Sequence, residues 1–200
     1  MQPGALPHPR PEAMPFTFRR PTLDDAEMIL DWRTRPEITR FMMTDIANDL
    51  DKQRHWLEST ARREDFEHFL ILREGRPVGY LSYAEIDRVN RHCVPGTYMA
   101  LEQHERHLAA HTNSFIMDYC FYRLGMNKAR FLIMAGNDHF IRAKHLTSVR
   151  EVGVLREHVF KYGRYHDLHL FEQTRAEWEA IPRLFSRDTT GKAFPADDLG

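Results

Sequence analysis

After a short extended segment at 16–19, the first third of the chain carries apolar residues at helical spacing. Thr22 can cap the helix that follows, because Asp25 stands three residues later in the arrangement of a capping box. The proline at position 36 ends this helix, since the residue before a proline avoids the helical region. A second helix is predicted to begin at position 48 or 49.

From position 68 the pattern becomes typical of strands. Residues 68–73 and 78–83 flank a turn that contains Gly75 and Pro77, which predicts a β-hairpin. Residues 94–101 are predicted to add a third strand to this meander.

The second half of the chain opens with an amphipathic helix over 109–124, which Gly125 ends. The remaining predicted elements are a buried strand at 130–135, a helix from 136 to about 147, and a closing hairpin of strands 154–161 and 165–171. The predicted order is therefore β α α β β β α β α β β.

One domain accounts for most of the 200 residues, of which 42% are hydrophobic and 28% are charged. Residues 1–15 hold five prolines without apolar periodicity, and residues 184–200 have no pattern that could bury a face. Both ends are predicted to be mobile tails, and residues 16–183 are predicted to form the single domain.

Composition excludes several classes of protein. No apolar run approaches the roughly 20 residues of a membrane span, and no apolar segment of a signal peptide follows the first residues, so we expect a cytoplasmic protein without membrane contact. Cys93 and Cys120 are expected to be reduced thiols. The formal net charge of -1 argues against a nucleic-acid partner.

Four segments, 16–27, 30–38, 119–130 and 153–167, together with Asn137, resemble the acetyl-CoA-dependent N-acetyltransferases of the GNAT superfamily. The similarity runs in order from about residue 16 to residue 178 and includes the predicted order of elements. Within the superfamily the chain resembles the ribosomal-protein N-terminal acetyltransferases. It resembles more closely the amino-sugar acetyltransferases of pseudaminic acid biosynthesis.

The resemblance implies a mixed α/β (α+β) fold with a mostly antiparallel sheet of six to seven strands and helices on both faces. A V-shaped slot is expected between the strands that end at Leu101 and Ala135, and we expect a pocket there lined by Tyr98, Ala100, Asn137 and Phe140. The cofactor would be acetyl-CoA or another acyl-CoA. The implied cofactor-binding residues are Met99, Ala100, Leu101, His104, Arg106, His107, Leu108, Ala109, Asn137 and Phe140.

Three departures from the family pattern fall at the cofactor end of the fold. His107 stands where the pyrophosphate loop usually has a glycine, Lys144 stands where a tyrosine usually protonates the leaving thiolate, and Ser148–Val149 replaces a Gly-Phe pair. These losses suggest altered donor binding. They leave open another acyl carrier, such as the phosphopantetheine of an acyl-carrier protein, or a non-catalytic binding module.

Acyl transfer needs a base, donors for an oxyanion and an acid for the thiolate. Glu85 or His104 could be the base, with Tyr98 relaying through water, and Lys144 could neutralise the thiolate or a phosphate. For Lys144 an exposed helix face is the simpler interpretation. By resemblance, the amide of Ala100 or Leu101 is the expected oxyanion donor.

The predicted reaction moves an acyl group from CoA to a primary amine, either of a nucleotide-linked amino sugar or of a similar small metabolite. Arg33 and Arg35 either bind the nucleotide diphosphate or form a solvated basic face, and Tyr80 and Tyr83 are expected to line the slot or pack in the core. A homodimer is possible. His104, His107 and His111 are spaced for a metal site, but contact with phosphates is the simpler hypothesis, so no metal is expected.

Overall fold

The computed structural model describes residues 13–101, 108–147 and 149–195. Its strands are β1 (Thr17–Arg19), β2 (Glu67–Arg73), β3 (Arg76–Asp87), β4 (His92–Met99), β5 (Lys128–Met134), β6 (Arg150–Lys161) and β7 (Arg164–Thr174). Its helices are η1 (Leu23–Asp25), α1 (Ala26–Thr34), α2 (Pro36–Thr39), α3 (Leu50–Thr60), α4 (Thr112–Asp118), the π-helical turn η3 (Tyr119–Arg123), α5 (Asp138–Leu146), α6 (Arg175–Ala180) and α7 (Arg187–Gly191).

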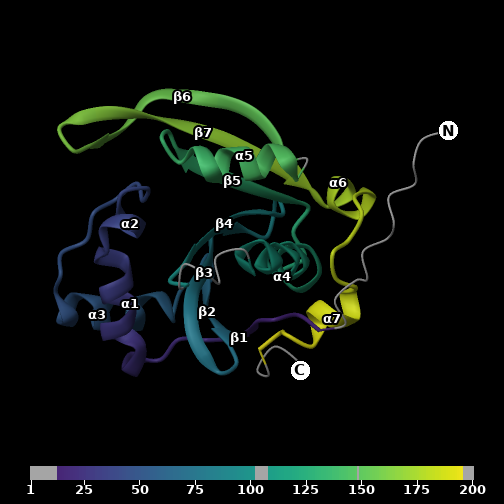
Figure 1. Cartoon of the computed structure of the whole chain (residues 1–200), viewed down its shortest axis with the longest axis horizontal. Coiled ribbons are helices and arrows are strands. Elements are labelled where there is room, and N and C mark those ends of the chain that lie inside the picture. Colours follow the sequence, from purple (N-terminus) through teal and green to yellow (C-terminus); the bar gives the residue numbers. More distant parts are fainter. Residues whose placement is uncertain (1–12, 102–107, 148, 196–200) are drawn as a thin grey trace.

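The strands form one sheet in the order β1-β2-β3-β4-β5-β7-β6, and only β4 and β5 run parallel to each other. These two central strands pair at His92 with Lys128 and at Cys93 with Ala129, and then separate. Figure 1 shows them diverging in the middle of the molecule. The predicted mixed fold, with a mostly antiparallel sheet that splits between these strands, is therefore confirmed.

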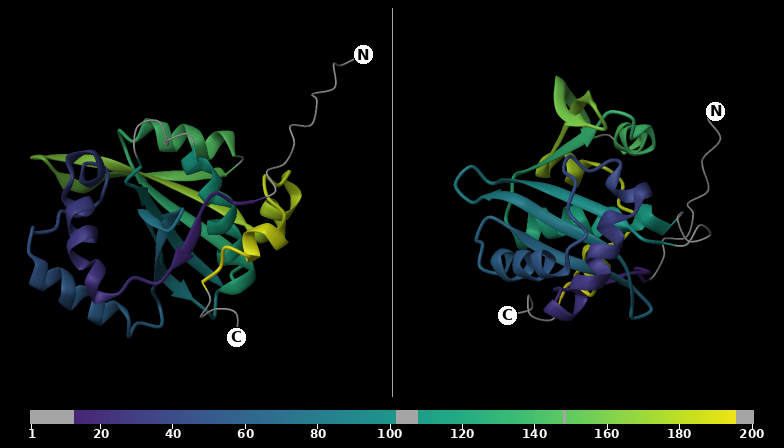
Figure 2. Two further views of the ribbon diagram at one scale, coloured as in Figure 1. Left: turned by 60° about the horizontal axis from the view of Figure 1, so that its bottom comes forward. Right: turned by 90° about the vertical axis from the view of Figure 1, so that its left-hand side faces the viewer.

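Helices cover both faces of the sheet, because the central strands bury residues on both sides. In β2, Leu70 packs with Trp32 of α1 and Leu57 of α3, whereas its neighbour Phe69 packs with Phe115 of α4. Alternate side chains of a strand point to opposite faces, so one apolar run serves two cores. Figures 1 and 2 show α1, α2 and α3 grouped together, while α5 lies beside the β6–β7 hairpin.

The start of α1 forms as the sequence predicts. The Thr22 backbone N–H donates to Asp25 Oδ2 at 2.7 Å, which completes the capping box, and Arg19 binds both oxygens of the same carboxylate. The segment opens with the 3-10 turn η1 before it becomes α-helical.

The C-terminal segment differs from the prediction that nothing after Arg183 is buried. Phe185 and Ala193 are buried, and α7 contributes the buried Thr190. No apolar period signals this burial, because α7 is only five residues long and its buried Thr190 makes a polar contact, with Asp118 of α4. The boundary of the domain at residue 183 stays a prediction, and residues 1–12 and 196–200 of the two expected tails lie outside the described residues.

Every helix among the described residues is too short or too polar to span a membrane.

Gly79 holds β3 and β4 close together at the edge of the split. A Cβ atom there would lie 2.7 Å from Met99 Sδ and 2.8 Å from the Tyr98 carbonyl oxygen. We expect Gly79→Ala to lower the free energy of unfolding by about 2 to 3 kcal/mol in urea denaturation, because the backbone of β4 must move. Gly153→Ala is the matched control, since a Cβ on that strand glycine meets no atom within 4 Å. Equal effects of the two substitutions would contradict this close approach.

Candidate active site

The slot between β4 and β5 exposes backbone groups that have no strand partner. The Ala100 N–H donates to the Val78 carbonyl of β3 at 2.7 Å. Because peptide groups alternate sides along a strand, those of Thr97 and Met99 face the other way, toward β5. Such groups can hydrogen-bond to an extended ligand that carries amide groups, as they would to another strand of the sheet. The pairing with Val78 corrects the expectation that the Ala100 amide is a free oxyanion donor, and the same alternation leaves Leu101 as the candidate.

Side chains next to this slot divide between the two faces of the sheet. Met99 and Leu101 pack on the side of α4, whereas Tyr98 and Ala100 pack on the side of α1 and α3. Leu108 and Ala109 lie just before α4 and also pack on its side. Three of the expected cofactor-binding residues, His104, Arg106 and His107, lie outside the described residues.

Asn137 forms the N-terminal end of α5. Its carbonyl oxygen accepts from the N–H groups of Phe140 and Ile141, each at 3.0 Å, and its own side chain makes no capping hydrogen bond. Phe140 is half-buried against the core on the α4 side. The helix therefore begins directly after β5, at the open end of the slot.

Lys144 of α5 is buried, with only 4% of its surface exposed. Its Nζ lies 3.5 Å from the centre of the Phe131 ring and 5.0 Å from that of Phe140. Burial lowers the pKa of Lys144 to about 7. The expectation of an exposed lysine was wrong, because Lys144 stands four residues after Phe140 and three after Ile141 and so shares their inward stripe.

On the side of α1, the structure brings together three residues that the sequence singles out. Tyr98 stacks on Tyr80 with ring centres 5.4 Å apart, and Arg33 interacts electrostatically with Tyr98. Arg33 Nη2 donates to the Thr44 carbonyl at 2.8 Å. The Tyr98 hydroxyl and Arg33 Nη1 are buried and have no hydrogen-bond partner among the described residues.

The charges of these groups follow from their burial. Burial raises the pKa of Tyr98 and the nearby Arg33 charge opposes it, so the hydroxyl stays protonated at neutral pH. Burial lowers the pKa of Arg33, while Tyr98 and Asp45 oppose that shift. Neither of these two buried donors therefore has an acceptor within the described ranges 13–101, 108–147 and 149–195. Unpaired buried donors are costly, and that cost is removed when a ligand oxygen binds them.

His68 is a member of this cluster that sequence reasoning missed. Its Nδ1 lies 2.7 Å from the Tyr80 hydroxyl. Burial, together with the charge of Arg20, lowers the pKa of His68 to about 4, so the imidazole is neutral. Its place at the start of a strand, two residues before Leu70 and hence on the same face, was the signal that could have found it.

Three expected site residues lie elsewhere. Glu85 sits in a bulge of β3 with φ of 51°, is exposed, and pairs with Arg130 at 2.6 Å near the closed end of the slot. Ala84 lies opposite Val94, which is four residues or roughly 13 Å along β4 from Tyr98. The expectation that Glu85 and Tyr98 border one site therefore needs correction.

Tyr83 and Arg35 make their hydrogen bonds and ion pairs outside the cluster. Tyr83 is fully buried on the α4 face, where its hydroxyl donates to the Ile116 carbonyl at 2.9 Å. Arg35 makes a surface ion pair with Asp31, four residues earlier, at 2.5 Å. The expected contact of Tyr83 with substrate is therefore corrected, while the ion pair of Arg35 favours the solvated basic face over binding of a diphosphate. For Tyr83 the reason is strand alternation, which places it on the face opposite Tyr80.

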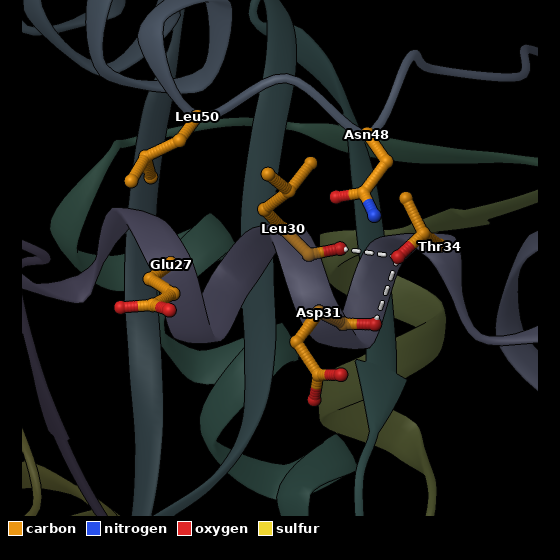
Figure 3. Close-up of a pocket in the computed structure, with 6 residues that line it drawn as sticks. All are labelled: Glu27, Leu30, Asp31, Thr34, Asn48 and Leu50. Atoms are coloured by element: carbon orange, nitrogen blue, oxygen red, sulfur yellow. Dashed lines mark hydrogen bonds between the residues drawn. The ribbon is translucent and has the colours of Figure 1, made fainter.

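A cavity of about 320 Å³ lies along α1, lined by Glu27, Leu30, Asp31, Thr34, Asn48 and Leu50. Figure 3 shows these side chains around the helix, with the Thr34 hydroxyl bonded to the carbonyl oxygens of Leu30 and Asp31. None of these residues belongs to β4, β5 or α5, so this cavity is distinct from the expected slot pocket. The pocket lined by Tyr98, Ala100, Asn137 and Phe140 stays a prediction.

Among the described parts of the chain, no three histidine, cysteine, aspartate or glutamate side chains converge as metal ligands. His104 and His107, two of the three histidines considered for a metal site, lie outside those parts.

Comparison with known proteins gives two sequence relatives. The N-acetyltransferase p20 of Bacillus licheniformis, described as uncharacterized, is 22% identical over 168 residues that cover 82% of this chain and 94% of that protein. The "Putative ribosomal N-acetyltransferase YdaF" of Bacillus subtilis (strain 168) is 25% identical over 109 residues, or 54% of this chain and 60% of that protein.

Among solved structures, spermidine N-acetyltransferase from Vibrio cholerae in complex with CoA and spermine superposes with a TM-score of 0.77. It shares 17% sequence identity, and the match covers 82% of this chain and 98% of that one. This likeness supports the fold. The family model described as "Acetyltransferase (GNAT) domain" matches residues 16–143, which is more than half of the chain. The chain therefore belongs to the GNAT acetyltransferase family.

Proposed function

We propose that the protein is an acyl-CoA-dependent N-acetyltransferase that acetylates a primary amine of a small metabolite. The observation that carries this proposal is the separation of β4 from β5 after two paired positions. It leaves an edge of backbone groups that an extended pantetheine arm can complete. Membership of the GNAT family supports the same activity.

Residues on both sides of the slot fit this cofactor. The peptide groups of Thr97 and Met99 would bind the pantetheine amides, and Asn137 and Phe140 would flank the arm at the start of α5. Leu108 and Ala109 precede α4, where the resemblance expects the pyrophosphate. His104, Arg106 and His107 remain proposed pyrophosphate contacts. When bound, acetyl-CoA supplies the thioester whose acetyl group is transferred.

The chain supplies the proton chemistry around the thioester. The Leu101 N–H is proposed to donate to the thioester carbonyl oxygen. Lys144, with its pKa of about 7, holds a proton at Nζ that it can release near neutral pH, which suits a donor to a leaving sulfur. The Glu85 carboxylate forms an ion pair with Arg130, so His104 is the proposed base.

The finer proposal is an acceptor that carries an anionic group, such as a nucleotide-linked amino sugar. Arg33 Nη1 and the Tyr98 hydroxyl, which lack a partner in the described part of the chain, support it, because both are donors that suit phosphate or carboxylate oxygens. The positive charge of the half-buried Arg33 also repels a polycation such as spermine. Arg35 contributes less to this proposal, because its guanidinium is already bound to Asp31.

Another acyl carrier remains the second candidate. The observation that favours it is the histidine at position 107, where the resemblance expects a glycine of the pyrophosphate loop. A carrier protein would present phosphopantetheine without the adenosine side of CoA, so the departure at His107 would matter less. A non-catalytic binding module is the outcome if neither carrier binds.

A homodimer remains the proposed assembly. Exposed apolar side chains on β6 and around the β6–β7 turn support it, and they are Val152, Val154, Leu155, Phe160, Tyr162 and Tyr165.

The test is a thermal-shift titration with acetyl-CoA, free CoA and a phosphopantetheine-loaded carrier protein, followed by an assay of thiol release with amine acceptors. We expect acetyl-CoA to raise the melting temperature, because a ligand at 100 times its Kd adds about 2.7 kcal/mol of stability. A UDP-linked amino sugar should release thiol faster than spermidine. Stabilisation by the carrier protein alone would favour the second candidate, and no stabilisation by any donor would refute acyl transfer.

Two arginine variants sharpen the acceptor assignment within the same assay. Arg33→Gln should raise the KM for the amino sugar about tenfold or more, because it removes a charge-assisted hydrogen bond. Arg35→Gln is the matched control and should change the KM less than about twofold, since it breaks a surface ion pair. Equal effects would argue against a subsite at Arg33.

A further inference from the structure

Lys161, the last residue of β6, inserts its side chain into the loop between α2 and α3 (residues 40–49). The side chain is only 2% exposed. Its Nζ donates to the Thr39 carbonyl at 2.5 Å and to the Met42 carbonyl at 2.9 Å, and it pairs with Asp45 Oδ1 at 2.8 Å. The three ammonium protons thus match three oxygens. Figure 1 shows the tip of the β6–β7 hairpin reaching over α2.

The same loop also binds Arg33. The Thr44 carbonyl accepts from Arg33 Nη2 at 2.8 Å, and Asp45 accepts from the Thr39 hydroxyl at 3.2 Å. Asp45 also interacts electrostatically with Arg33. Backbone oxygens of Thr39, Met42 and Thr44 are therefore directed at two cations from different parts of the chain. The position of the loop and the position of the Arg33 guanidinium depend on each other.

A bulge in β6 bends the hairpin above this loop. The pairing with β7 shifts between Leu155 and Val159, and Glu157 adopts φ of 51° while its N–H donates to Asp167 Oδ1 at 2.8 Å. Residues beside Lys161 stay outside, since Phe160 and Tyr162 are more than 60% exposed. The hairpin tip therefore enters the loop through one charged side chain rather than through an apolar contact.

A buried ammonium is an expensive way to join two segments, because desolvation opposes it and an apolar residue would serve as well for stability alone. The ammonium group adds directionality, because its hydrogen bonds hold the carbonyl oxygens of Thr39 and Met42 in particular positions. We propose that Lys161 is a positioning residue of the acceptor site, which fixes the α2–α3 loop and through Thr44 aims Arg33 at the acceptor. This inference rests on the proposed function, because it assigns Arg33 to acceptor binding.

The test compares Lys161→Met with wild-type enzyme in three measurements on the full chain. We expect trypsin to cleave after Arg40, within the loop, at least tenfold faster, because the loop loses its three contacts. We expect the KM for the amino sugar to rise about tenfold or more while the Kd of acetyl-CoA, measured by calorimetry, changes less than twofold. Lys161→Arg should recover part of the loss, since it keeps the charge.

Two controls keep these measurements decisive. Lys52→Met changes a lysine whose side chain is 75% exposed, and it should leave all three values unchanged. Asp45→Asn removes the charge partner without touching Lys161, so it should repeat the faster cleavage even if Lys161→Met folds poorly.

Unchanged cleavage in both Lys161→Met and Asp45→Asn would overturn the proposal. So would faster cleavage with an unchanged acceptor KM, since Lys161 would then serve structure only. A wild-type enzyme that acetylates no amine would instead overturn the proposed function and, with it, the acceptor role, while cleavage would still report whether Lys161 holds the loop.

Discussion

We expect Lys144→Met to raise the free energy of unfolding by about 3 to 5 kcal/mol at pH 6. The pKa of Lys144 falls from its ordinary 10.5 to about 7 in the folded protein, because the ammonium is buried against Phe131 and Phe140. Each unit of such a shift corresponds to about 1.36 kcal/mol. Methionine fills the same space without a charge, so the variant avoids this penalty.

The sign of the pH dependence follows from proton binding. Between pH 7 and 10.5 the unfolded chain holds the Lys144 proton more tightly than the folded protein does, so wild-type stability rises with pH across this window. Below pH 7 both states are protonated, and the penalty is complete and constant. The advantage of the variant should therefore shrink from pH 6 to about 2 kcal/mol at pH 9.

Urea denaturation at pH 6, 7.5 and 9 measures both effects. Lys192→Met is the matched control, because Lys192 is exposed and its loss should change stability by less than about 0.5 kcal/mol at each pH. A variant without added stability at pH 6, or with the same pH dependence as wild type, would contradict a desolvated ammonium. If Lys144 is the acid of the reaction, the same variant should lose about 10²-fold or more in kcat. A residue that costs stability and supports the rate is typical of an active site.

The second large effect is expected at Asp118, where Asp118→Ala should lower the free energy of unfolding by about 3 to 5 kcal/mol. This carboxylate at the end of α4 is 1% exposed and accepts from Trp178 Nε1 at 2.8 Å, from the Thr190 hydroxyl at 2.5 Å and from Arg183. Its removal leaves three donors from α6, α7 and the segment between them without their acceptor. The Arg183 guanidinium, which is mostly buried, would carry an unpaired charge.

Urea denaturation followed by tryptophan fluorescence checks this, since Trp178 reports its own environment. Asp31→Ala is the matched control, because it breaks a surface ion pair at the end of α1 and should change stability by less than about 0.5 kcal/mol. Asp118→Asn should fall between the two, as it keeps an acceptor oxygen but loses the charge. A loss at Asp118 no larger than at Asp31 would mean that the C-terminal segment is held by its apolar contacts alone.

Much of the fold could be predicted because it depends on local patterns. The alternation of residues 68–83 and the turn at Gly75 predict the β2–β3 hairpin, and the Thr22–Asp25 pair predicts the start of the first helix. These signals lie within a few residues of each other, so chain neighbours decide them. The split between β4 and β5 was predicted only from the family resemblance. A helix lies between these strands in the sequence, so no local pattern shows where they stop pairing.

The candidate site could be predicted in part. Tyr98, Tyr80 and Arg33 were named from the sequence, and the structure brings them together on one face. Tyr83 was assigned to the same site, although its spacing of three from Tyr80 already places it on the opposite face of a strand. That error lay in the interpretation and not in the sequence.

By itself, the sequence determined the order of the seven strands and of the longer helices, because hydrophobic periodicity and capping act between near neighbours. The short helices α2, α6 and α7 were missed. Only the tertiary structure decided which charged groups are buried and with what partners. It buries Lys144 against Phe131, hydrogen-bonds Lys161 to a loop some 120 residues away, and forms an ion pair between Glu85 and Arg130. The physical reason is that the pKa and the ion-pair partners of a charged group depend on atoms that the whole fold brings near it. No local sequence pattern contains that information.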